Sequence, residues 1–232
     1  MSVTTVTTPA PTSLPAPKPR RKRGRAVVLS NVDWKTYTRL LKALDERPRL
    51  RLTYDQGELE IMVTSSEHEG ETEFLGRLIV TMTQAFSLPI RAGGSVTMKR
   101  KRMQKGLESD KCFWIANAAK LAGVKRLDLK IHPPPDLAIE VDVTSSSMNR
   151  FRIYAALGVP EVWRLEGDAL SFHQLAGKKY AEVPTSPTFA GIAPADLMTF
   201  VKQARTAPDE NATVDAFRAW LQARLAPPPA AP

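Results

Sequence analysis

The sequence predicts one domain of the α/β or α+β class, a mixed β-sheet flanked by helices. The predicted order of elements is helix, hairpin, helix, strand pair, strand, helix and further strands, and such mixed alternation favours a single mixed sheet. The stretch 135–143 alternates apolar and polar residues as a strand does. With 232 residues, 43% of them apolar, the chain is long enough for one domain with a sizeable core.

The two ends of the chain are expected to lie outside this domain, which we place at residues 27–225. Residues 1–17 lack hydrophobic periodicity and are predicted to be disordered. Residues 226–232 are rich in Pro and Ala and are predicted to form a loose tail. A basic arm completes the N-terminal tail, residues 1–26, and its charged residues are Lys18, Arg20, Arg21, Lys22, Arg23 and Arg25.

The basic arm holds most of the positive charge. The chain has a formal net charge of +9, and the six cations of the tail, which has no acid, leave +3 for the rest. Such an arm could bind nucleic-acid phosphates through counterion release, or could serve only as a solubilising tail. The sequence leaves both readings open.

The first half of the domain begins with a helix over about 32–44, capped by Ser30 or Asn31. A hairpin follows, with arms at 49–54 and 58–64 around the turn Asp55-Gln56-Gly57. Ser66 and Glu69 fit a capping box that starts a second helix, which is predicted to reach about Phe86. Its inward residues are expected to be Phe74, Leu75, Leu78, Ile79 and Met82.

A strand pair is predicted next, at 95–98 and 106–115, with a charged turn at 99–102. A short helix near 116–121 then leads to the central strand at 135–143. One face of this strand is apolar and carries Leu137, Ile139, Val141 and Val143. The opposite face carries three carboxylates, Asp136, Glu140 and Asp142, which a hard divalent cation could compensate. The alternative is a strand with one solvated acidic face.

A helix is predicted after the central strand. Residues 144–147 offer N-caps, and Gly158 with Pro160 ends the helix. Its apolar stripe is Met148, Phe151, Tyr154 and Leu157. Strands near 159–164, 169–174 and 180–183 and two final helices, the last at about 214–225, complete the prediction.

Several classes of protein are excluded by composition and motif. The single Cys112 excludes an internal disulfide and a Cys-rich zinc site, and it fits a reducing cytoplasm. No apolar run approaches ~20 residues and no secretory signal is visible, so we expect a cytoplasmic protein without a membrane partner. The chain has no GxSxG, HExxH, P-loop or GxGxxG motif.

The central stretch carries a family resemblance. The run is PDLAIEVDVTSSSMNRFRIYAALGVPEVWRL, and the segments RLTYDQGELEIMVTSSEHE and GLESDKCFWIAN look similar to the same family. The chain resembles the bacterial Uma-two family of the PD-(D/E)XK nuclease superfamily. The resemblance runs from about residue 32 to the final helix and implies the restriction-endonuclease-like fold.

The resemblance also implies a metal site and an activity, the hydrolysis of phosphodiester bonds in nucleic acid. The expected nucleic acid is DNA. Asp110 and Glu140 correspond to the two metal-binding acids, and the carbonyl of Val141 to a further ligand of Mg²⁺, for which Mn²⁺ should substitute. Asp142 could add a contact. Arg150 stands where the family has a catalytic Lys, and Ser109 where it has Pro.

The Lys-to-Arg difference bears on mechanism. Arg150 can stabilise phosphate charge but cannot act as a base, because its pKa lies above ~12. Arg152 is a weaker substitute and a candidate nucleic-acid contact. Glu69 is a candidate accessory acid but fits a capping box better, and His68 beside it is more often structural in such a position.

Two functions therefore remain open from the sequence. The first is a Mg²⁺-dependent endonuclease, favoured by Asp110, Glu140 and Asp142. The second is a catalytically weakened nuclease-like module that binds DNA or a protein, favoured by Arg150 and Ser109. Cleavage of both strands requires two sites, so a homodimer is expected.

Overall fold

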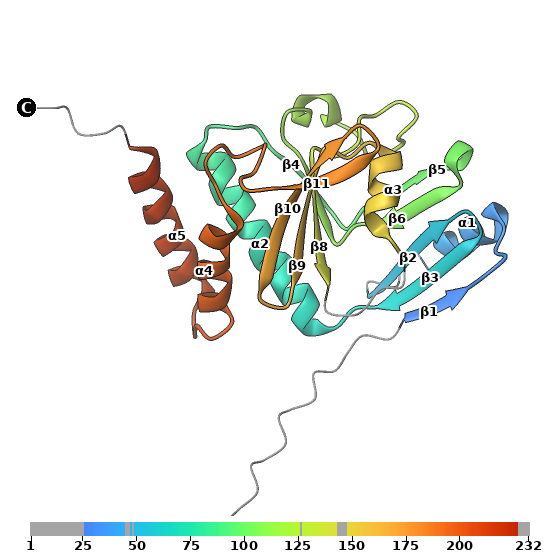
Figure 1. Ribbon diagram of the computed structural model, residues 1–232, viewed down its shortest axis with the longest axis horizontal. Coiled ribbons are helices and arrows are strands. Elements are labelled where there is room, and N and C mark those ends of the chain that lie inside the picture. Colours follow the sequence, from blue (N-terminus) through green and yellow to red (C-terminus); the bar gives the residue numbers. More distant parts are fainter. Residues whose placement is uncertain (1–25, 45–46, 48, 126, 143–147, 227–232) are drawn as a thin grey trace, which may run out of the picture.

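The computed structural model describes residues 26–44, 47, 49–125, 127–142 and 148–226. Over these residues the chain forms two β-sheets with helices packed against them, and the helix at residues 150–157 lies between the two sheets (Figure 1). The predicted mixed α/β architecture, a mixed sheet flanked by helices, is confirmed. The expectation of one sheet is not, because the strands divide between two.

The first sheet is antiparallel throughout. Its strand order is β1 (Ala26–Leu29), β3 (Glu58–Val63), β2 (Leu50–Asp55), β6 (Lys105–Glu108) and β5 (Thr97–Arg100). Helix α1 (Trp34–Ala43) packs on it through a small core of Tyr37, Leu41, Leu52, Tyr54 and Leu59. Strand β1 was not anticipated: Ala26, assigned to the tail from the sequence, pairs with Met62.

The β2–β3 hairpin turns as its sequence predicts. Gln56 and Gly57 both have positive φ, 51° and 100°, which is the backbone of a type I′ turn. This two-residue turn matches the right-handed twist of its strands and fixes the register from Leu50 opposite Val63 to Asp55 opposite Glu58.

The second sheet is mixed. Its strand order is β11 (Lys179–Val183), β10 (Ala169–Ala176), β9 (Glu161–Glu166), β8 (Leu137–Asp142), β7 (Lys111–Trp114) and β4 (Arg91–Gly94). Only β8 and β9 are parallel, and α3 (Arg150–Leu157) connects them. The other neighbouring strands of this sheet pair antiparallel, an arrangement that allows hairpin connections.

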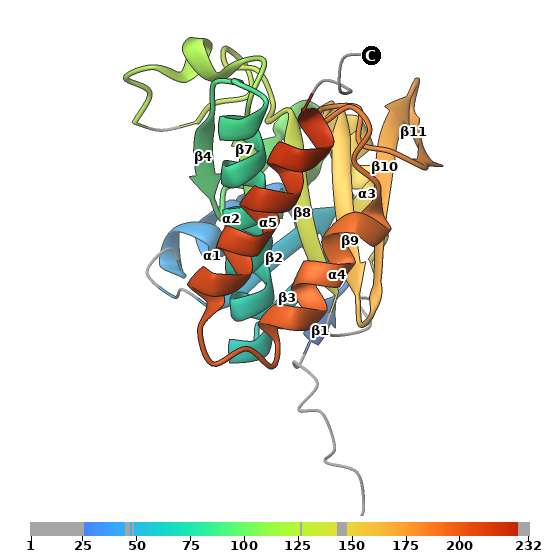
Figure 2. The same ribbon diagram turned by 90° about the vertical axis from the view of Figure 1, so that its left-hand side faces the viewer.

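Helices cover both faces of this mixed sheet. Helices α2 (Ser66–Ala85), α4 (Pro194–Ala204) and α5 (Glu210–Leu225) lie on one face, as Figure 2 shows, and α3 lies on the other (Figure 1). The larger core contains the five residues of α2 that were expected to point inward. No helix in the described part of the chain is long and apolar enough to span a membrane.

Strand β8 is buried on both faces. Leu137, Ile139 and Val141 enter the larger core, as their alternation predicts, while Ala138 packs in a second core under α3. Glu140 shares the face of Ala138 and is only 8% exposed. The alternative of a solvated acidic face is therefore wrong for Glu140, because the second sheet is covered by α3 on that side.

Three helix starts differ from the prediction. Asp33 caps α1, accepting the N–H of Thr36 at 2.6 Å, in place of Ser30 or Asn31. Ser65 caps α2 through the N–H of His68, so Ser66 and Glu69 form no capping box. Asn149 caps α3, and the caps expected at 144–147, like Val143, lie outside the described residues.

The predicted strand over 106–115 is divided into two. Strand β6 belongs to the first sheet and β7 to the second, and Ser109 and Asp110 form the junction between them. The short helix that follows is a 3₁₀ turn at Ala118–Leu121. The division places Asp110 at the seam between the sheets.

Candidate active site

Asp110 immediately precedes β7, and Glu140 lies on the neighbouring strand β8. Lys111 pairs with Ile139 and Cys112 with Ala138, so continuing the antiparallel ladder by one residue sets Asp110 opposite Glu140. The Oδ2 atom of Asp110 accepts the N–H of Val141 at 2.9 Å. The two acids that the sequence singled out line one cavity.

Asp110 is held by a buried histidine. The Nε2 atom of His68 lies 3.0 Å from Oδ2, and Nε of Arg51 lies 3.8 Å from Oδ1. Asp110 is 4% exposed, and burial alone would raise its pKa. The hydrogen bond and charge of His68, with Arg150 and the N–H of Val141, outweigh burial and lower the pKa of Asp110.

Glu140 is held by a guanidinium. Nε of Arg150 lies 2.6 Å from Oε2, and the NH2 nitrogen donates to Oε1 at 2.9 Å. The hydroxyl of Tyr154 also donates to Oε1. Burial, opposed by Arg150 and reinforced by the charge of Asp110, raises the pKa of Glu140 to about 7.

Arg150 connects the two sheets. Besides Glu140 on β8, it donates to the backbone oxygen of Glu108 on β6 at 2.6 Å and to Oγ1 of Thr53 on β2 at 3.0 Å. Burial works against its positive charge, but the carboxylate of Glu140 outweighs burial and raises the pKa of Arg150. Arg150 therefore remains a cation at any working pH.

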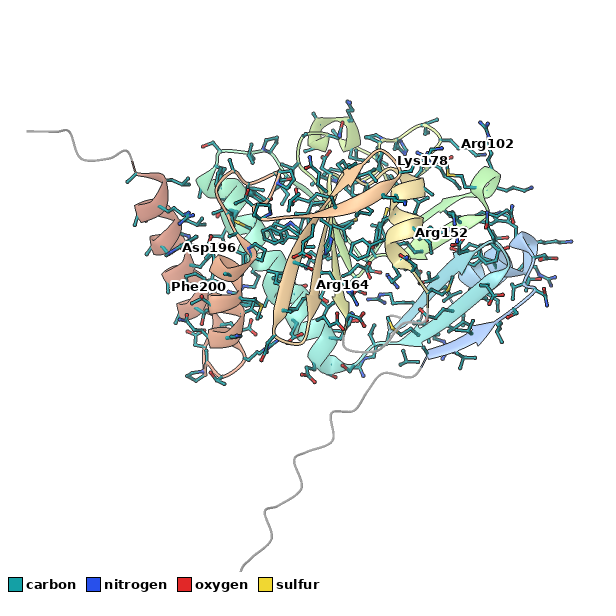
Figure 3. The ribbon with its side chains drawn as sticks, viewed as in Figure 1. Arg102, Arg152, Arg164, Lys178, Asp196 and Phe200 are labelled. Atoms are coloured by element: carbon teal, nitrogen blue, oxygen red, sulfur yellow. The ribbon has the colours of Figure 1, made fainter. Side chains whose placement is uncertain are left out.

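A cavity of about 350 Å³ opens over these side chains. Its walls combine charged groups with the apolar side chains of Met62, Met148 and Phe151. Of the cationic side chains labelled in Figure 3, Arg152 lies on α3 and Arg164 on β9, and Arg164 lines this cavity.

The other residues expected from the sequence take varied places. Asp142 lines the cavity and pairs with Arg164 at 2.8 Å. Arg152 is 60% exposed at its side chain and contacts Gln56 and Asp55. Asp136 lies outside the site, where it accepts two backbone N–H groups. The basic arm lies outside the described residues.

Glu69 contacts residues next to the two acids and does not contact the acids themselves. Its Oε1 accepts the hydroxyl of Thr64 at 2.6 Å and the guanidinium of Arg51 at 3.2 Å. It also lies 3.7 Å from Nδ1 of His68. Glu69 therefore contacts both Arg51 and His68, the two side chains next to Asp110.

Three site residues were missed or undervalued in the sequence: His68, Arg51 and Tyr154. His68 was read as structural, Tyr154 as core, and Arg51 was not considered. Tyr154 is in fact fully buried, but its position four residues after Arg150 puts both on one face of α3. That spacing is the one signal from which its contact with Glu140 could have been inferred.

Ser109, at the position where the family resemblance implies Pro, makes contacts of its own. It is fully buried, and its N–H donates to the carbonyl of Val96 at 3.3 Å. A proline at this position would lack that N–H. The difference from the family therefore fits the local hydrogen bonding of this chain.

The donor set suits a hard divalent cation only in part. Mg²⁺ is commonly held by one or two carboxylates with waters and a substrate phosphate, and Asp110 with Glu140 supply two. Among the described residues, Oδ1 of Asp110 is buried without a hydrogen bond, which leaves an oxygen for a ligand, but no group of three His, Cys, Asp or Glu is placed to hold a metal. The residues fit a two-carboxylate Mg²⁺ site in which Arg150 shares Glu140.

The mixed sheet with helices on both faces is the architecture that the family resemblance implies. A family model described as "Putative restriction endonuclease" matches residues 34–201. The chain belongs to this family, Uma2 (Uma-two), which confirms the resemblance seen in the sequence.

Other comparisons add little. A solved structure described as a "putative nuclease belonging to DUF820" from Anabaena variabilis is similar over 65% of this chain and 90% of its own, with 13% identity and a TM-score of 0.43. The search of curated proteins found no match.

Proposed function

We propose that this protein is a Mg²⁺-dependent endonuclease that hydrolyses phosphodiester bonds in DNA. The observation that carries the proposal is the placement of Asp110 opposite Glu140 in the lining of one cavity, with a permanent cation, Arg150, beside them. Membership of the Uma2 family supports it.

Each residue of the site has a separate role in the proposed reaction. Asp110 and Glu140, with the carbonyl of Val141, would hold Mg²⁺ or Mn²⁺, and Asp142 could add a contact. The metal would supply charge neutralisation and an activated water. Arg150 would stabilise negative charge that develops on the phosphate. His68 holds Asp110 in place through the contact at 3.0 Å.

One observation favours the second candidate, a nuclease-like module that binds nucleic acid without cutting it efficiently. Arg150 and Tyr154 already engage both oxygens of Glu140, which weakens its availability to a metal. Arg150 also cannot replace a Lys that must exchange a proton.

The experiment is a cleavage assay on supercoiled plasmid, single-stranded DNA and RNA, with Mg²⁺ and with Mn²⁺. Wild type should cut at least one substrate, while Asp110→Asn and Glu140→Gln, which preserve size and remove charge, should not. Equal background from all three proteins on every substrate would reject the enzyme in favour of the binding module.

We also propose a homodimer, because cutting both strands of a duplex requires two sites and two-fold pairs are the commonest assembly. Light scattering coupled to size exclusion measures the mass directly. A monomer that nevertheless makes double-strand breaks would contradict this part of the proposal.

A further inference from the structure

The guanidinium of Arg150 occupies both oxygens of Glu140 in the free protein. Nε lies 2.6 Å from Oε2, and NH2 donates to Oε1 at 2.9 Å. The side chains of Arg150 and Glu140 are each 11% exposed, so water screens this ion pair weakly. Nε makes no hydrogen bond within the described part of the chain, so the pair combines one hydrogen bond, from NH2 to Oε1, with a close, buried ion pair at Oε2.

The rest of the guanidinium is anchored as well. NH1 donates to Thr53 and NH2 to the carbonyl of Glu108, both on the first sheet. Arg150 consequently reaches Glu140 from α3 with its fork oriented by two further acceptors. An arginine oriented in this way does not rotate freely away from the carboxylate.

A divalent cation and Arg150 compete for the same oxygens. Both are positive, and both need the lone pairs of Glu140, so a metal bound there must displace at least one arm of the fork. Lysine is a single point donor and would leave one oxygen open, whereas arginine covers both. Asp110 differs, because its Oδ1 has no hydrogen bond among the described residues.

A phosphodiester would relieve this competition. Its non-bridging oxygens match the arginine fork as a carboxylate does, so a phosphate in the cavity offers Arg150 an alternative partner. Arg150 lines that cavity together with Asp110 and Glu140. If phosphate draws Arg150 from Glu140, a metal gains the carboxylate at the same moment.

We propose that Arg150 is a clamp on Glu140 that keeps divalent cations off this carboxylate in the free protein, and that a bound phosphodiester releases it. Metal and phosphodiester then bind cooperatively, and by linkage each raises the affinity of the other by the same factor. The metal site at Asp110 and Glu140 on which the clamp acts is itself part of the proposed function, so the test measures metal binding and needs no cleavage.

The experiment titrates Mn²⁺ alone into the full chain at about pH 8, above the raised pKa of Glu140, and measures free Mn²⁺ by its electron paramagnetic resonance signal. Arg150→Gln should bind Mn²⁺ at least about fivefold more tightly than wild type, the lower end of typical coupling between sites. Arg150→Lys, which keeps the charge and frees one oxygen, should lie between them. Equal affinity in wild type and Arg150→Gln overturns the clamp.

Two controls locate the effect. Arg152→Gln removes the same charge two residues along α3 from an exposed side chain, and it should leave Mn²⁺ affinity unchanged. Adding Glu140→Gln to Arg150→Gln should abolish the gain. A gain that persists without the Glu140 carboxylate, or that Arg152→Gln reproduces, also overturns the clamp. Thermal unfolding verifies that each variant is folded.

The release step uses a short oligothymidylate with phosphorothioate linkages. It should tighten Mn²⁺ binding to wild type but not to Arg150→Gln, while a methylphosphonate oligomer, which has no backbone charge, should have no effect. Equal Mn²⁺ affinity with and without the charged oligomer overturns the release. If Mn²⁺ binding behaves in this way but the protein cuts no DNA, the clamp is supported and the proposed nuclease function is rejected. If the protein cuts DNA but Mn²⁺ binding does not behave in this way, the nuclease function is supported and the clamp is rejected.

Discussion

The imidazole of His68 lies 3.0 Å from the carboxylate of Asp110, and both side chains are almost completely buried. The two residues are 42 positions apart in the chain, and packing of α2 against the second sheet brings them together. Burial opposes the charge of His68, but the hydrogen bond and charge of Asp110, with Glu69 and Glu140, outweigh it and raise the pKa of His68. This pair makes stability depend on pH in a defined direction.

We expect His68→Gln to lower stability more at about pH 6 than at about pH 9. A histidine whose pKa is raised in the folded chain contributes stability that is fully present below the ordinary pKa of 6.5 and is lost as pH rises through the raised value. Glutamine keeps a donor for Asp110 but does not titrate. Urea unfolding of both proteins across this pH range measures the difference.

His173 provides the control of opposite sign. Burial lowers its pKa, so wild-type His173 costs stability in acid and the cost disappears as pH rises. His173→Gln should therefore be less harmful at about pH 6 than at about pH 9. The same pH trend in both variants would mean that the change comes from elsewhere in the protein.

Cys112 should be unreactive in the folded chain. It is fully buried, and burial raises the pKa of its thiol to about 12, against a weaker opposing hydrogen bond from Ser109. At neutral pH the reactive thiolate is therefore almost absent. Ellman's reagent should modify it only as fast as the protein unfolds, and urea should accelerate the reaction; rapid stoichiometric reaction of the native protein would contradict the burial.

Removing residues 1–25 should leave the melting temperature nearly unchanged, because this segment has no apolar periodicity with which to pack. Ala26 is kept because it pairs with Met62 in β1. The truncation should reduce the log–log salt slope of DNA binding by up to about six phosphate contacts. Binding measured by fluorescence anisotropy over a range of salt gives the slope, and an identical slope would mean that the arm does not contact DNA.

The sequence predicted those parts of the site that depend on local pattern. Alternation along 137–142 placed Glu140 on the face opposite Ile139 and Val141, and family resemblance paired it with Asp110. His68 and Arg51 could not be found in this way, because their contact with Asp110 depends on how α2 and the β2–β3 hairpin pack. No periodicity within either segment encodes that contact.

The helix caps show a different limit of prediction from the sequence. Ser30, Asn31 and Asp33 are all good N-caps by residue type, so propensity alone does not choose between them. The structure selects Asp33, and Asn31 instead takes a positive φ of 59° in the preceding turn. The division of the strand at Ser109 was also missed, although the polar run Glu108-Ser109-Asp110-Lys111 interrupts the apolar residues of 106–115 at the junction between the two sheets.

Substitution of Arg150 separates metal binding from catalysis. Arg150→Ala removes the cation nearest the acids, so cleavage should fall by about 10²–10³-fold, the usual scale for one lost electrostatic group. The same variant frees Glu140, so the loss should occur even when Mn²⁺ is saturating. Single-turnover cleavage at saturating Mn²⁺ measures this directly, and Arg218→Ala, which removes the same charge from an exposed side chain of α5, serves as the charge-matched comparison.

Arg150→Lys is the decisive variant. It restores the family residue, leaves one oxygen of Glu140 open and introduces a group whose pKa can shift. We expect it to cut faster than wild type, because the fork that occupies both oxygens of Glu140 is gone while the positive charge remains. Equal or slower cleavage would mean that the site is adapted to arginine, with the bidentate fork itself stabilising the phosphate. Measuring both variants at fixed pH with Glu140→Gln as the inactive reference distinguishes these outcomes.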